Sequence, residues 1–463
     1  MGRNPDRVDS FDVSGSAGGE IRPRRGTAAT AAPVCLLLLV VVALSIGAIE
    51  HFNEDHQWIF ALAVAVLFLA RGVHLGRPLV APHVVGFCLL VATSLVAQFA
   101  GYGGIGMLFL ALSGLVLMWP TGSRPQPEML PGVHELVDRT ALDPLAPFAM
   151  HSFKSYFFAA NDNAVLGYHT RLGVAVVSGD PIGSSNDFPA LVAQFRHFCH
   201  SRGWRIAVLG ASERYRNLWT ESATAPAFRA VPIGRDVVID VDRFDMSTPP
   251  FRNLRQAVNR TRNAAMTTEV ILERDLPCEL RSELIEIAEQ SHGAKRRRGF
   301  SMILDHALDG RYPGMLIVLA RDKDGVVQGF QRHAVAGGGT EISLDIPWRR
   351  KGAPNGIDER LSVAMVEYAR EHGGKRVSLA FAAFPELFDD DNRGRVGQVL
   401  FRLIHLGDPL LSLESLYRYL KKFHALGDRR YVLVDFRMLP IAATALLTLE
   451  FLPRRTMTDR AST

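Results

Sequence analysis

The 463-residue sequence is poor in cysteine. Its four cysteines, Cys35, Cys88, Cys199 and Cys278, include no C-x-x-C pair. Closely spaced cysteines are the usual sign of a zinc site or a redox pair, and cysteines this scattered predict no disulfide framework. The fifteen histidines form no H-E-x-x-H motif, and no Walker phosphate loop is present. We therefore expect no metal site, no cofactor and no nucleotide hydrolysis, and a soluble part that faces a reducing compartment.

Charged residues are scarce between residues 34 and 119 and ordinary elsewhere. The region holds four apolar runs, at roughly 34–49, 58–75, 84–100 and 105–119. Each run is at or slightly below the ~17–25 residues that a membrane-spanning helix needs. A single run would also fit a buried helix of a soluble protein, but four in succession favour a transmembrane region of about four helices over 34–120. Residues 1–33, rich in Gly, Ala, Ser and Arg, are expected to form a flexible cytoplasmic tail.

The loops between the apolar runs differ in charge, and this difference predicts an orientation. Positive loops stay preferentially in the cytoplasm. Positive and non-positive loops alternate here, which places both termini in the cytoplasm and the soluble part at the inner face of the cell (plasma) membrane. The protein is thus expected to be a multi-pass membrane protein. The charges concerned are Arg22, Arg24, Arg25, Arg71, Arg77 and Arg124 on the inner side, and Glu50, Glu54 and Asp55 on the outer side.

The rest of the chain has the pattern of an α/β protein in which one order of elements occurs twice. Residues 121–147 are Pro-rich and predict a linker with one short helix. Three strands, a helix that ends near Gly203 and a further strand follow, and Asp324-Gly325 marks a hairpin in a second such series. This order resembles the N-acetyltransferase-like (GNAT) fold. We predict two GNAT-like units, 148–290 and 291–440, and a C-terminal tail, 441–463.

Two groups of basic residues could bind phosphates. On a helix over 251–266, Arg252, Arg255 and Arg262 would share one face, beside an apolar face with Leu254, Val258 and Ala265. Such a helix fits phosphates of tRNA or of an anionic lipid, and a solvated charged surface is the alternative. The second group is the run Lys295, Arg296, Arg297 and Arg298, for which the same two interpretations apply.

Acyl transfer from an activated ester needs positioning, an oxyanion donor and sometimes a base. Asp345, at the end of the third strand of the second unit, could hold a cationic amino group, and Glu359 in the following helix could do the same or act as a base. Lys422 and Arg430 could bind a phosphate or carboxylate. Each of these residues could equally be a surface or helix-capping residue.

Several motifs resemble a known family. GDPIG (179–183), RRGFSM (297–302), ISLD (342–345), GAPNGIDE (352–359), and KF and RY (422–423 and 430–431) occur in the order found in the multiple peptide resistance factor family, the lysylphosphatidylglycerol synthases. The resemblance covers about 148–440. It implies a tandem GNAT-like aminoacyltransferase that moves an amino acid, typically lysine, from aminoacyl-tRNA to phosphatidylglycerol. It also implies reduced binding of cationic antimicrobial peptides to the membrane, and a substrate site that includes Asp345, Trp348, Arg349 and Asn355.

Two other functions fit the same sequence. A GNAT-type enzyme with another acyl donor, such as acyl-CoA, would use RRKGAPNG (349–356) as its pyrophosphate turn, although Pro354 removes one N–H donor from that turn. A catalytically degenerate domain that binds lipid or protein is the third hypothesis. It is motivated by Trp348, Ala380 and Pro385, which stand where the family has Arg, Asn and Arg.

Overall fold

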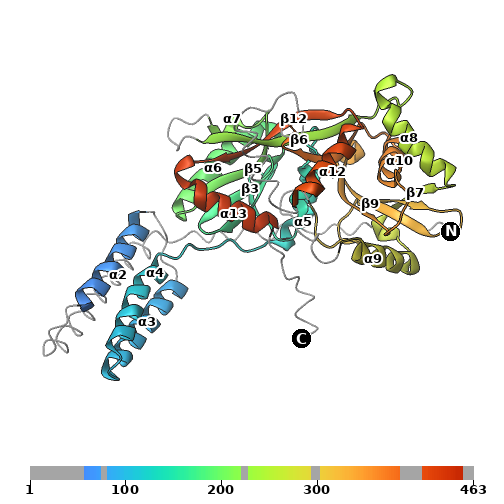
Figure 1. The fold of residues 1–463 in the computed structure, drawn as a ribbon. Coiled ribbons are helices and arrows are strands. Elements are labelled where there is room, and N and C mark those ends of the chain that lie inside the picture. The colour runs from blue at the N-terminus through green and yellow to red at the C-terminus, as the bar shows by residue number, and fades with distance from the viewer. Residues whose placement is uncertain (1–56, 75–80, 221–227, 293–302, 386–408, 452–463) are drawn as a thin grey trace, which may run out of the picture. The chain divides into compact units, whose positions relative to one another are not determined.

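A computed structural model of the chain describes residues 57–74, 81–220, 228–292, 303–385 and 409–451 (Figure 1). The chain divides into two compact units. The first runs to Thr121, and the second holds almost all residues from Gly122 onward.

The first unit contains three apolar helices in its described part. They are α2 (Gln57–His74), α3 (Ala81–Phe99) and α4 (Gly103–Leu117). Only α3, over Pro82–Phe99, is both long and apolar enough to cross a membrane, and the apolar stretches of α2 and α4 are shorter. The predicted run 34–49 lies outside the described residues. The predicted four-helix membrane region is therefore not confirmed; the described residues contain one candidate span.

Small residues bring these helices close together. A side chain at Gly114 of α4 would meet the carbonyl oxygen of Ala65 in α2 at 2.3 Å, and one at Gly106 would meet that of Ser94 in α3 at 2.9 Å. The Ser94 hydroxyl also donates a hydrogen bond to the Gly106 carbonyl at 2.6 Å. Close contact through Gly and Ser, with a hydroxyl bonded between helices, is typical of helix packing in membranes.

The second unit is built on one mixed sheet of twelve strands. Along the sheet the order is β1-β2-β3-β5-β12-β6-β11-β10-β9-β8-β7, and the short β4 pairs with β2. The strands are β1 (Ser155–Phe158), β2 (Ala164–Arg171), β3 (Val174–Ser178), β4 (Ile182–Gly183), β5 (Arg205–Ser212), β6 (Arg229–Asp240), β7 (Thr267–Leu272), β8 (Leu316–Arg321), β9 (Val327–Ala336), β10 (Glu341–Arg349), β11 (Arg376–Ala383) and β12 (Leu426–Val434).

The predicted order of elements occurs twice in this sheet. In the first half, β1, β2 and β3 form an antiparallel meander, α6 (Phe188–Ser201) follows, and β5 returns parallel to β3. In the second half, β8, β9 and β10 form the meander, α10 (Ile357–Glu371) follows, and β11 returns parallel to β10. The predicted mixed α/β fold is confirmed.

The two halves exchange strands at the centre of the sheet. Strand β6, which follows the first half in sequence, pairs with β11 of the second half. Strand β12, the last strand of the chain, pairs with β5 of the first half and with β6. The sheet therefore does not divide at residue 290, where the sequence suggested a boundary between two units.

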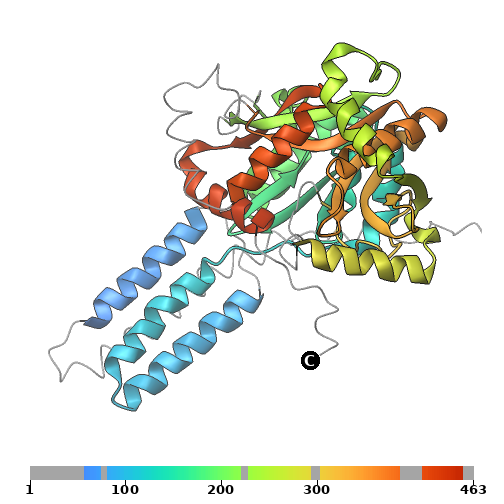
Figure 2. The ribbon, with the colours of Figure 1, turned by 45° about the vertical axis from the view of Figure 1, so that its right-hand side comes forward.

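Helices cover both faces of each half. In the first half, α6 packs on the side of Ala175 and Val177, and α13 (Leu439–Phe451) packs on the side of Val174 and Val176 (Figure 2). In the second half, α10 lies on one face together with α8 and α12, and α9 lies on the other. Their bounds are Arg252–Asn263 for α8, Cys278–His292 for α9 and Pro409–Lys421 for α12.

Two segments differ from their predicted character. The Pro-rich stretch 121–147 contains the predicted short helix, α5 (Leu130–Asp138), but Val133, Leu136 and Val137 of α5 are buried in a core shared with the sheet. Residues 441–463, predicted as a tail, begin inside α13, which is also packed on the sheet. In both places the apolar residues pack on strands of the sheet, most of which are distant in the sequence.

Candidate functional site

The candidate site lies where β10 and β11 stop pairing. The two parallel strands are paired only through Glu341–Ser343 and Arg376–Ser378. Beyond this point the register of β10 shifts between Leu344 and Ile346, which is a β-bulge at Asp345. A bulge redirects a side chain and is frequent beside active sites. Ile346 packs in the core beneath α9. Asp345 bonds to Arg332, which also bonds to the Asp305 carbonyl, so Asp345 lies on the same side of the sheet as Ile346.

Asp345 belongs to a buried network of charges. Its Oδ2 accepts a hydrogen bond from Arg332 Nη1 at 2.8 Å, and its Oδ1 accepts one from the backbone N–H of Leu304 at 2.8 Å. The Nε of Arg332 donates to Glu273 Oε2 at 2.6 Å. The side chains of Arg332 and both carboxylates have no exposed surface. Two carboxylates thus face one guanidinium, which leaves one negative charge uncompensated by Arg332.

Burial is the main reason that Asp345 binds a proton more tightly than a free carboxyl. Its pKa is raised to about 6; Arg332 and the Leu304 N–H oppose this rise, and the neighbouring Glu273 adds to it. The same two carboxylates raise the pKa of Arg332, which stays charged. A buried site with a surplus negative charge favours either a proton or a cationic group of a ligand.

A second polar cluster adjoins this network through the loop that follows Leu304. The Asp305 carboxylate accepts hydrogen bonds from the hydroxyls of Ser152 and Tyr312, and His151 Nδ1 lies 3.8 Å from it. Burial alone would raise the pKa of Asp305, but His151 and the two hydroxyl donors outweigh it and lower the pKa. The Asp305 carbonyl faces Arg332 Nη1 at 3.5 Å.

Sequence reasoning missed Arg332, Glu273 and Asp305. One signal was available, because Gln331, Arg332 and His333 are three consecutive polar residues inside an otherwise apolar strand. All three have no exposed surface, and buried charged residues need partners. Burial lowers the pKa of His333 to about 3, so this imidazole is neutral.

The other predicted substrate residues lie apart from Asp345. Trp348 is buried and stacks on Phe330, with ring centroids 4.8 Å apart. Arg349 is exposed and forms an ion pair with Asp358 at 3.4 Å. Asn355 is exposed in the turn before α10.

Glu359 and Lys422 form a pair on the α10 side of the sheet. Glu359 Oε1 lies 2.5 Å from Lys422 Nζ, and Glu359 is buried whereas Lys422 is partly exposed. Gln331 donates to the Ser362 hydroxyl at 3.2 Å on the same side, and Ser362 contacts the Tyr419 hydroxyl. The structure therefore places Glu359 and Lys422 together but separates them from Asp345 by the sheet.

Arg430, predicted to bind a phosphate or carboxylate of the substrate, is fully buried among protein carboxylates. It contacts Asp143 at 2.7 Å, Asp236 at 2.8 Å and Asp180 at 3.1 Å, and its side chain is 1% exposed. Its carboxylate partners are part of the protein. Together they join β6 and β12 to the segments that follow α5 (Asp143) and β3 (Asp180).

The basic helix α8 has the predicted exposed arginines at both ends. Arg252 and Arg262 are exposed, whereas Arg255 is partly buried and donates to the Thr248 carbonyl at 2.7 Å. Leu254 and Val258 are buried as predicted, but Ala265 lies beyond the helix end and is exposed, with φ 54°. The second basic group, with Lys295, Arg296 and Arg297, lies outside the described residues.

A neighbouring arginine on α10 completes the positive charge of α8. Arg360 is partly buried, and its Nε and Nη1 have no hydrogen-bond partner within the part of the chain that the structure describes. Burial lowers the pKa of Arg360; Glu367 raises it, and the charge of Arg262 lowers it. Two guanidinium groups therefore lie near each other, and that of Arg262 is exposed. Neighbouring guanidinium groups suit a phosphate oxygen.

The N-terminus of α10 is closed by α8. Gly356 has φ 103°, and a Cβ at this position would lie 2.5 Å from the Ala257 carbonyl oxygen. The first turn of α10 carries Asp358 and Glu359, whose charges oppose an incoming anion. The end of the turn predicted as a pyrophosphate site for acyl-CoA is thus tightly packed at Gly356, and the helix that follows it begins with two carboxylates.

We expect Gly356→Ala to lower stability by roughly 2–4 kcal/mol, because it combines a left-handed backbone with a steric clash against α8. Gly352 in the same turn is a matched control: it has φ 89°, but its Cβ would meet nothing within 4 Å. Gly352→Ala should cost only about 1 kcal/mol. Thermal unfolding of both variants in detergent measures the difference, and equal losses would show that α8 can move away.

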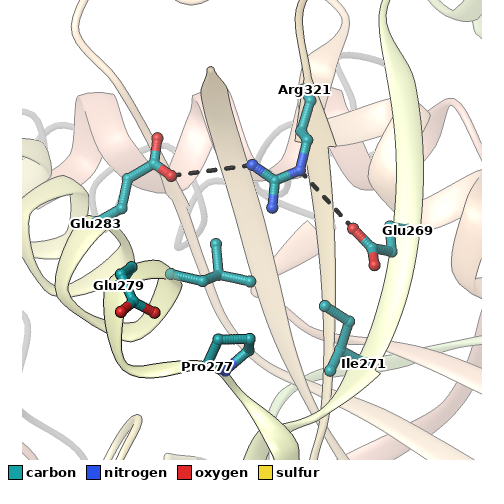
Figure 3. A pocket seen from close by; sticks show the side chains of 7 residues that line it. Glu269, Ile271, Pro277, Glu279, Glu283 and Arg321 are labelled. Atoms are coloured by element: carbon teal, nitrogen blue, oxygen red, sulfur yellow. Dashed lines mark ion pairs between the residues drawn. The ribbon is translucent and has the colours of Figure 1, made fainter. Parts of the chain in front are cut away.

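An acidic hollow lies at the far edge of the second half, between α9 and strands β7 and β8 (Figure 3). It encloses about 370 Å³. Arg321 bridges Glu269 at 3.7 Å and Glu283 at 3.9 Å across it. None of the residues that line it was predicted as a site residue. Among the described residues, no group of histidine, cysteine or carboxylate side chains is arranged to hold a metal ion.

Known proteins show the same organisation. Residues 134–434 match the family described as "Phosphatidylglycerol lysyltransferase, C-terminal". The chain is 52% identical over 400 residues to the "MprF-like domain protein Rv1619" of Mycobacterium tuberculosis, covering 86% of this chain and 83% of that protein. It is 30% identical over 388 residues to the "Lysylphosphatidylglycerol biosynthesis bifunctional protein LysX" of Mycobacterium avium, of which it spans only 32%.

Solved structures share the fold. The C-terminal domain of a putative lysylphosphatidylglycerol synthetase from Agrobacterium fabrum superposes with a TM-score of 0.61 at 22% identity, covering 71% of this chain and 99% of that domain. L-PGS from Bacillus licheniformis superposes with a TM-score of 0.58 at 22% identity, covering 72% and 99%. The resemblance seen in the sequence is confirmed: the chain belongs to the family of phosphatidylglycerol lysyltransferase C-terminal domains, a family of transferases.

Proposed function

We propose that this protein moves an amino acid from aminoacyl-tRNA to phosphatidylglycerol at the inner face of the cell membrane, to which a multi-pass membrane region anchors it. The observation that carries the proposal is the buried network beside the point where β10 and β11 stop pairing. Among the described residues, Asp345 and Glu273 share Arg332 as their one ion-pair partner. An aminoacyl group brings an ammonium ion, and this is the charge that the network lacks. We propose lysine as the amino acid, as in the names of the relatives.

The proposed reaction exchanges one ester for another. A hydroxyl of the lipid headgroup attacks the ester carbonyl of the aminoacyl group, the new C–O bond forms, and the C–O bond to the ribose of the tRNA breaks. The proton of the lipid hydroxyl ends on the ribose oxygen. Because the donor is already activated, the protein has to position both substrates and stabilise charge, and no cofactor is required. The lipid gains a positive charge, which weakens the attraction of the membrane for cationic peptides.

The charge distribution favours tRNA over acyl-CoA as the donor. The N-terminus of α10, where a CoA pyrophosphate would bind, is closed by Ala257 of α8 and carries two carboxylates. The exposed arginines of α8, Arg252 and Arg262, lie on the solvent side of this helix. A polyanion is therefore better accommodated along α8 than within the turn.

Replacing Arg262 and Arg360 together by alanine should raise the KM for aminoacyl-tRNA about tenfold and reduce its salt dependence, because each lost phosphate contact weakens binding and lowers the salt slope. The turnover at saturating tRNA should change little. Arg243→Ala is the matched control, because Arg243 is 88% exposed and, within the described residues, has one ion pair, with Asp240 at 3.6 Å. A loss of turnover with unchanged KM would contradict a role in tRNA binding.

The central test uses the purified full chain in vesicles that contain phosphatidylglycerol. Each of several tRNAs charged with a radiolabelled amino acid is added, and the label in extracted lipid is measured. We expect label from lysyl-tRNA in a lipid that migrates as an aminoacylated phosphatidylglycerol. If none of the charged tRNAs labels the lipid while Asp345→Asn and the wild type behave alike, the proposed function is wrong. Labelling from acyl-CoA instead would select the alternative donor.

A further inference from the structure

The last described helix, α13, is apolar on both of its sides. On its inner side, Ala445 and Leu449 are buried against β3 and β5 of the first half of the sheet, and Ala442 is also buried. Its outer side is exposed at Leu439, Ile441 and Leu447, at 39%, 42% and 56%. A helix on the surface of a soluble protein normally turns polar residues outward. This one carries no charged residue from Met438 to Leu449.

The turn that precedes the helix adds a further large exposed apolar side chain. Phe436 in this turn is 53% exposed. We call Phe436, Leu439, Ile441 and Leu447 the α13 face. Exposed patches of large apolar side chains mark contacts with membranes or other proteins.

The polar groups on the outer part of α13 are satisfied by the helix itself. The Thr444 hydroxyl donates to the Pro440 carbonyl at 2.8 Å, and the Thr448 hydroxyl donates to the Ala445 carbonyl at 3.0 Å. Neither hydroxyl proton therefore needs water as its acceptor. Such bonds back to the helix are the way in which Ser and Thr are accommodated where water is absent.

Positive charge lies at the end of the sheet that α13 covers. Arg171 at the end of β2 and Arg205 at the start of β5 are both in register with Val174, which packs in the α13 core. Both arginines are exposed, and so is Arg124. Within the described parts of the chain, no carboxylate forms an ion pair with any of the three. Arginines near a membrane surface attract anionic headgroups.

The same end of the sheet receives the chain from the apolar helices. The backbone N–H of Thr170, next to Arg171, donates a hydrogen bond to the Ser123 hydroxyl oxygen at 3.0 Å. Ser123, at the start of the second unit, is therefore held beside Arg171.

We propose that the α13 face, with Arg124, Arg171 and Arg205, lies on the surface of an anionic lipid bilayer. The apolar side chains would enter the boundary between headgroups and acyl chains, and the arginines would meet lipid phosphates. This contact is separate from any membrane-spanning helix, and it would hold the transferase sheet in one orientation on the membrane. An acidic protein partner is the less suitable occupant, because the surface combines a charge-free apolar helix with a basic margin.

The test places a photoreactive residue, p-benzoylphenylalanine, at position 447 of the full chain in vesicles that contain radiolabelled phospholipid. The control carries it at position 285 of α9, where Ile285 is a helical apolar residue with 41% exposure. After irradiation, we expect lipid adducts at position 447 to exceed those at position 285 about tenfold, because position 447 would enter the bilayer and position 285 would stay in water. The yield should rise with the fraction of phosphatidylglycerol over phosphatidylcholine.

Two results would overturn this proposal. Equal lipid adducts at the two positions would show that α13 does not meet the bilayer, and an adduct between two protein chains at position 447 would assign the face to a second copy. A second measure places the probe at position 441. The double variant Leu439→Glu/Leu447→Glu should abolish lipid crosslinking from this probe, whereas the control variant Ile285→Glu should leave it unchanged. The experiment needs no tRNA, so its outcome does not depend on the proposed reaction.

Discussion

Replacing Arg430 by methionine should leave little or no folded protein. The change removes the cation that contacts Asp143, Asp180 and Asp236 and leaves their carboxylates buried without it. Breaking one buried ion pair by removing a partner costs about 3–5 kcal/mol, and here three carboxylates lose the same partner. The whole stability of a domain is only about 5–15 kcal/mol.

The expected measurement is the yield of monodisperse protein in detergent together with its thermal unfolding midpoint. Arg429→Met is the matched control, because Arg429 is the exposed neighbour on the same strand, and it should behave like the wild type. Sequence reasoning predicted that Arg430 binds substrate. A folded Arg430→Met variant that loses only its transfer activity would support that earlier role and contradict the structural one.

The pH dependence of the variant follows from the carboxylates. Burial raises the pKa of Asp180 to about 6 and also raises that of Asp236, in each case against the lowering effect of Arg430. A carboxyl with a raised pKa in the folded state contributes stability that is full below its unfolded pKa of about 4 and is lost as the pH rises through the folded pKa. Without Arg430 these pKa values rise further. Any residual folding of the variant should therefore be better at pH 5 than at pH 8.

The elements of the sheet were predictable because their signals are local. Alternating apolar residues and the Asp324-Gly325 turn indicated β8 and β9, and the backbone N–H of Gly325 does bond to the Asp322 carbonyl at 3.0 Å. Helix α10 begins at Ile357, as the pattern predicted. The repeat of meander, helix and parallel strand could be identified from these local patterns alone.

Contacts between distant segments were not predictable. Asp143 and Arg430 are 287 residues apart, and no local pattern indicates that β12 crosses to the first half of the sheet. The same limit explains the segment 121–147. Its prolines resemble those of a linker, yet α5 is buried because the sheet offers an apolar surface to Val133 and Val137.

The candidate site was found in part for a related reason. Asp345 was identified from its position at the end of the third strand of the second unit, but regular alternation along a strand would place Asp345 and Ile346 on opposite faces. The bulge at Asp345 breaks this alternation and places both side chains on one face. A bulge of one residue has no recognisable sequence pattern here, so it could not be predicted. Arg332 was missed because its partners, Glu273 and Asp345, lie 59 and 13 residues away.

Replacing Asp345 by asparagine should abolish lipid aminoacylation, by at least about 100-fold, without unfolding the protein. Asparagine keeps the shape and can accept the Leu304 N–H, but it removes the negative charge that an ammonium group would meet. Losses of 10²–10³ are typical when one preorganised electrostatic interaction is removed from an active site. Asp358→Asn is the control. Asp358 is a carboxylate just after the turn between β10 and α10, and it forms an ion pair with the exposed Arg349.

Stability separates this role from a structural one. The pKa of Asp345 is about 6 in the folded protein and about 4 in an unfolded chain, so its ionised form costs the fold roughly 3 kcal/mol at neutral pH. Asparagine relieves this cost and leaves Arg332 matched by Glu273, which offsets the lost hydrogen bond from Arg332. The variant should therefore unfold at or above the wild-type temperature at pH 7.5, and should lack the wild type's gain in stability from this group between pH 6 and pH 4.

Activity should show the opposite pH dependence. If the ionised carboxylate holds the ammonium group, wild-type activity falls as the pH drops through about 6, where Asp345 takes up a proton and the surplus charge disappears. The residual activity of Asp345→Asn should be flat over the same range. A purely structural Asp345 would predict the reverse combination, in which the asparagine variant loses stability and keeps the wild-type pH profile. Stability and activity measured together from pH 5 to pH 8 therefore decide whether the buried surplus charge serves the fold or the substrate.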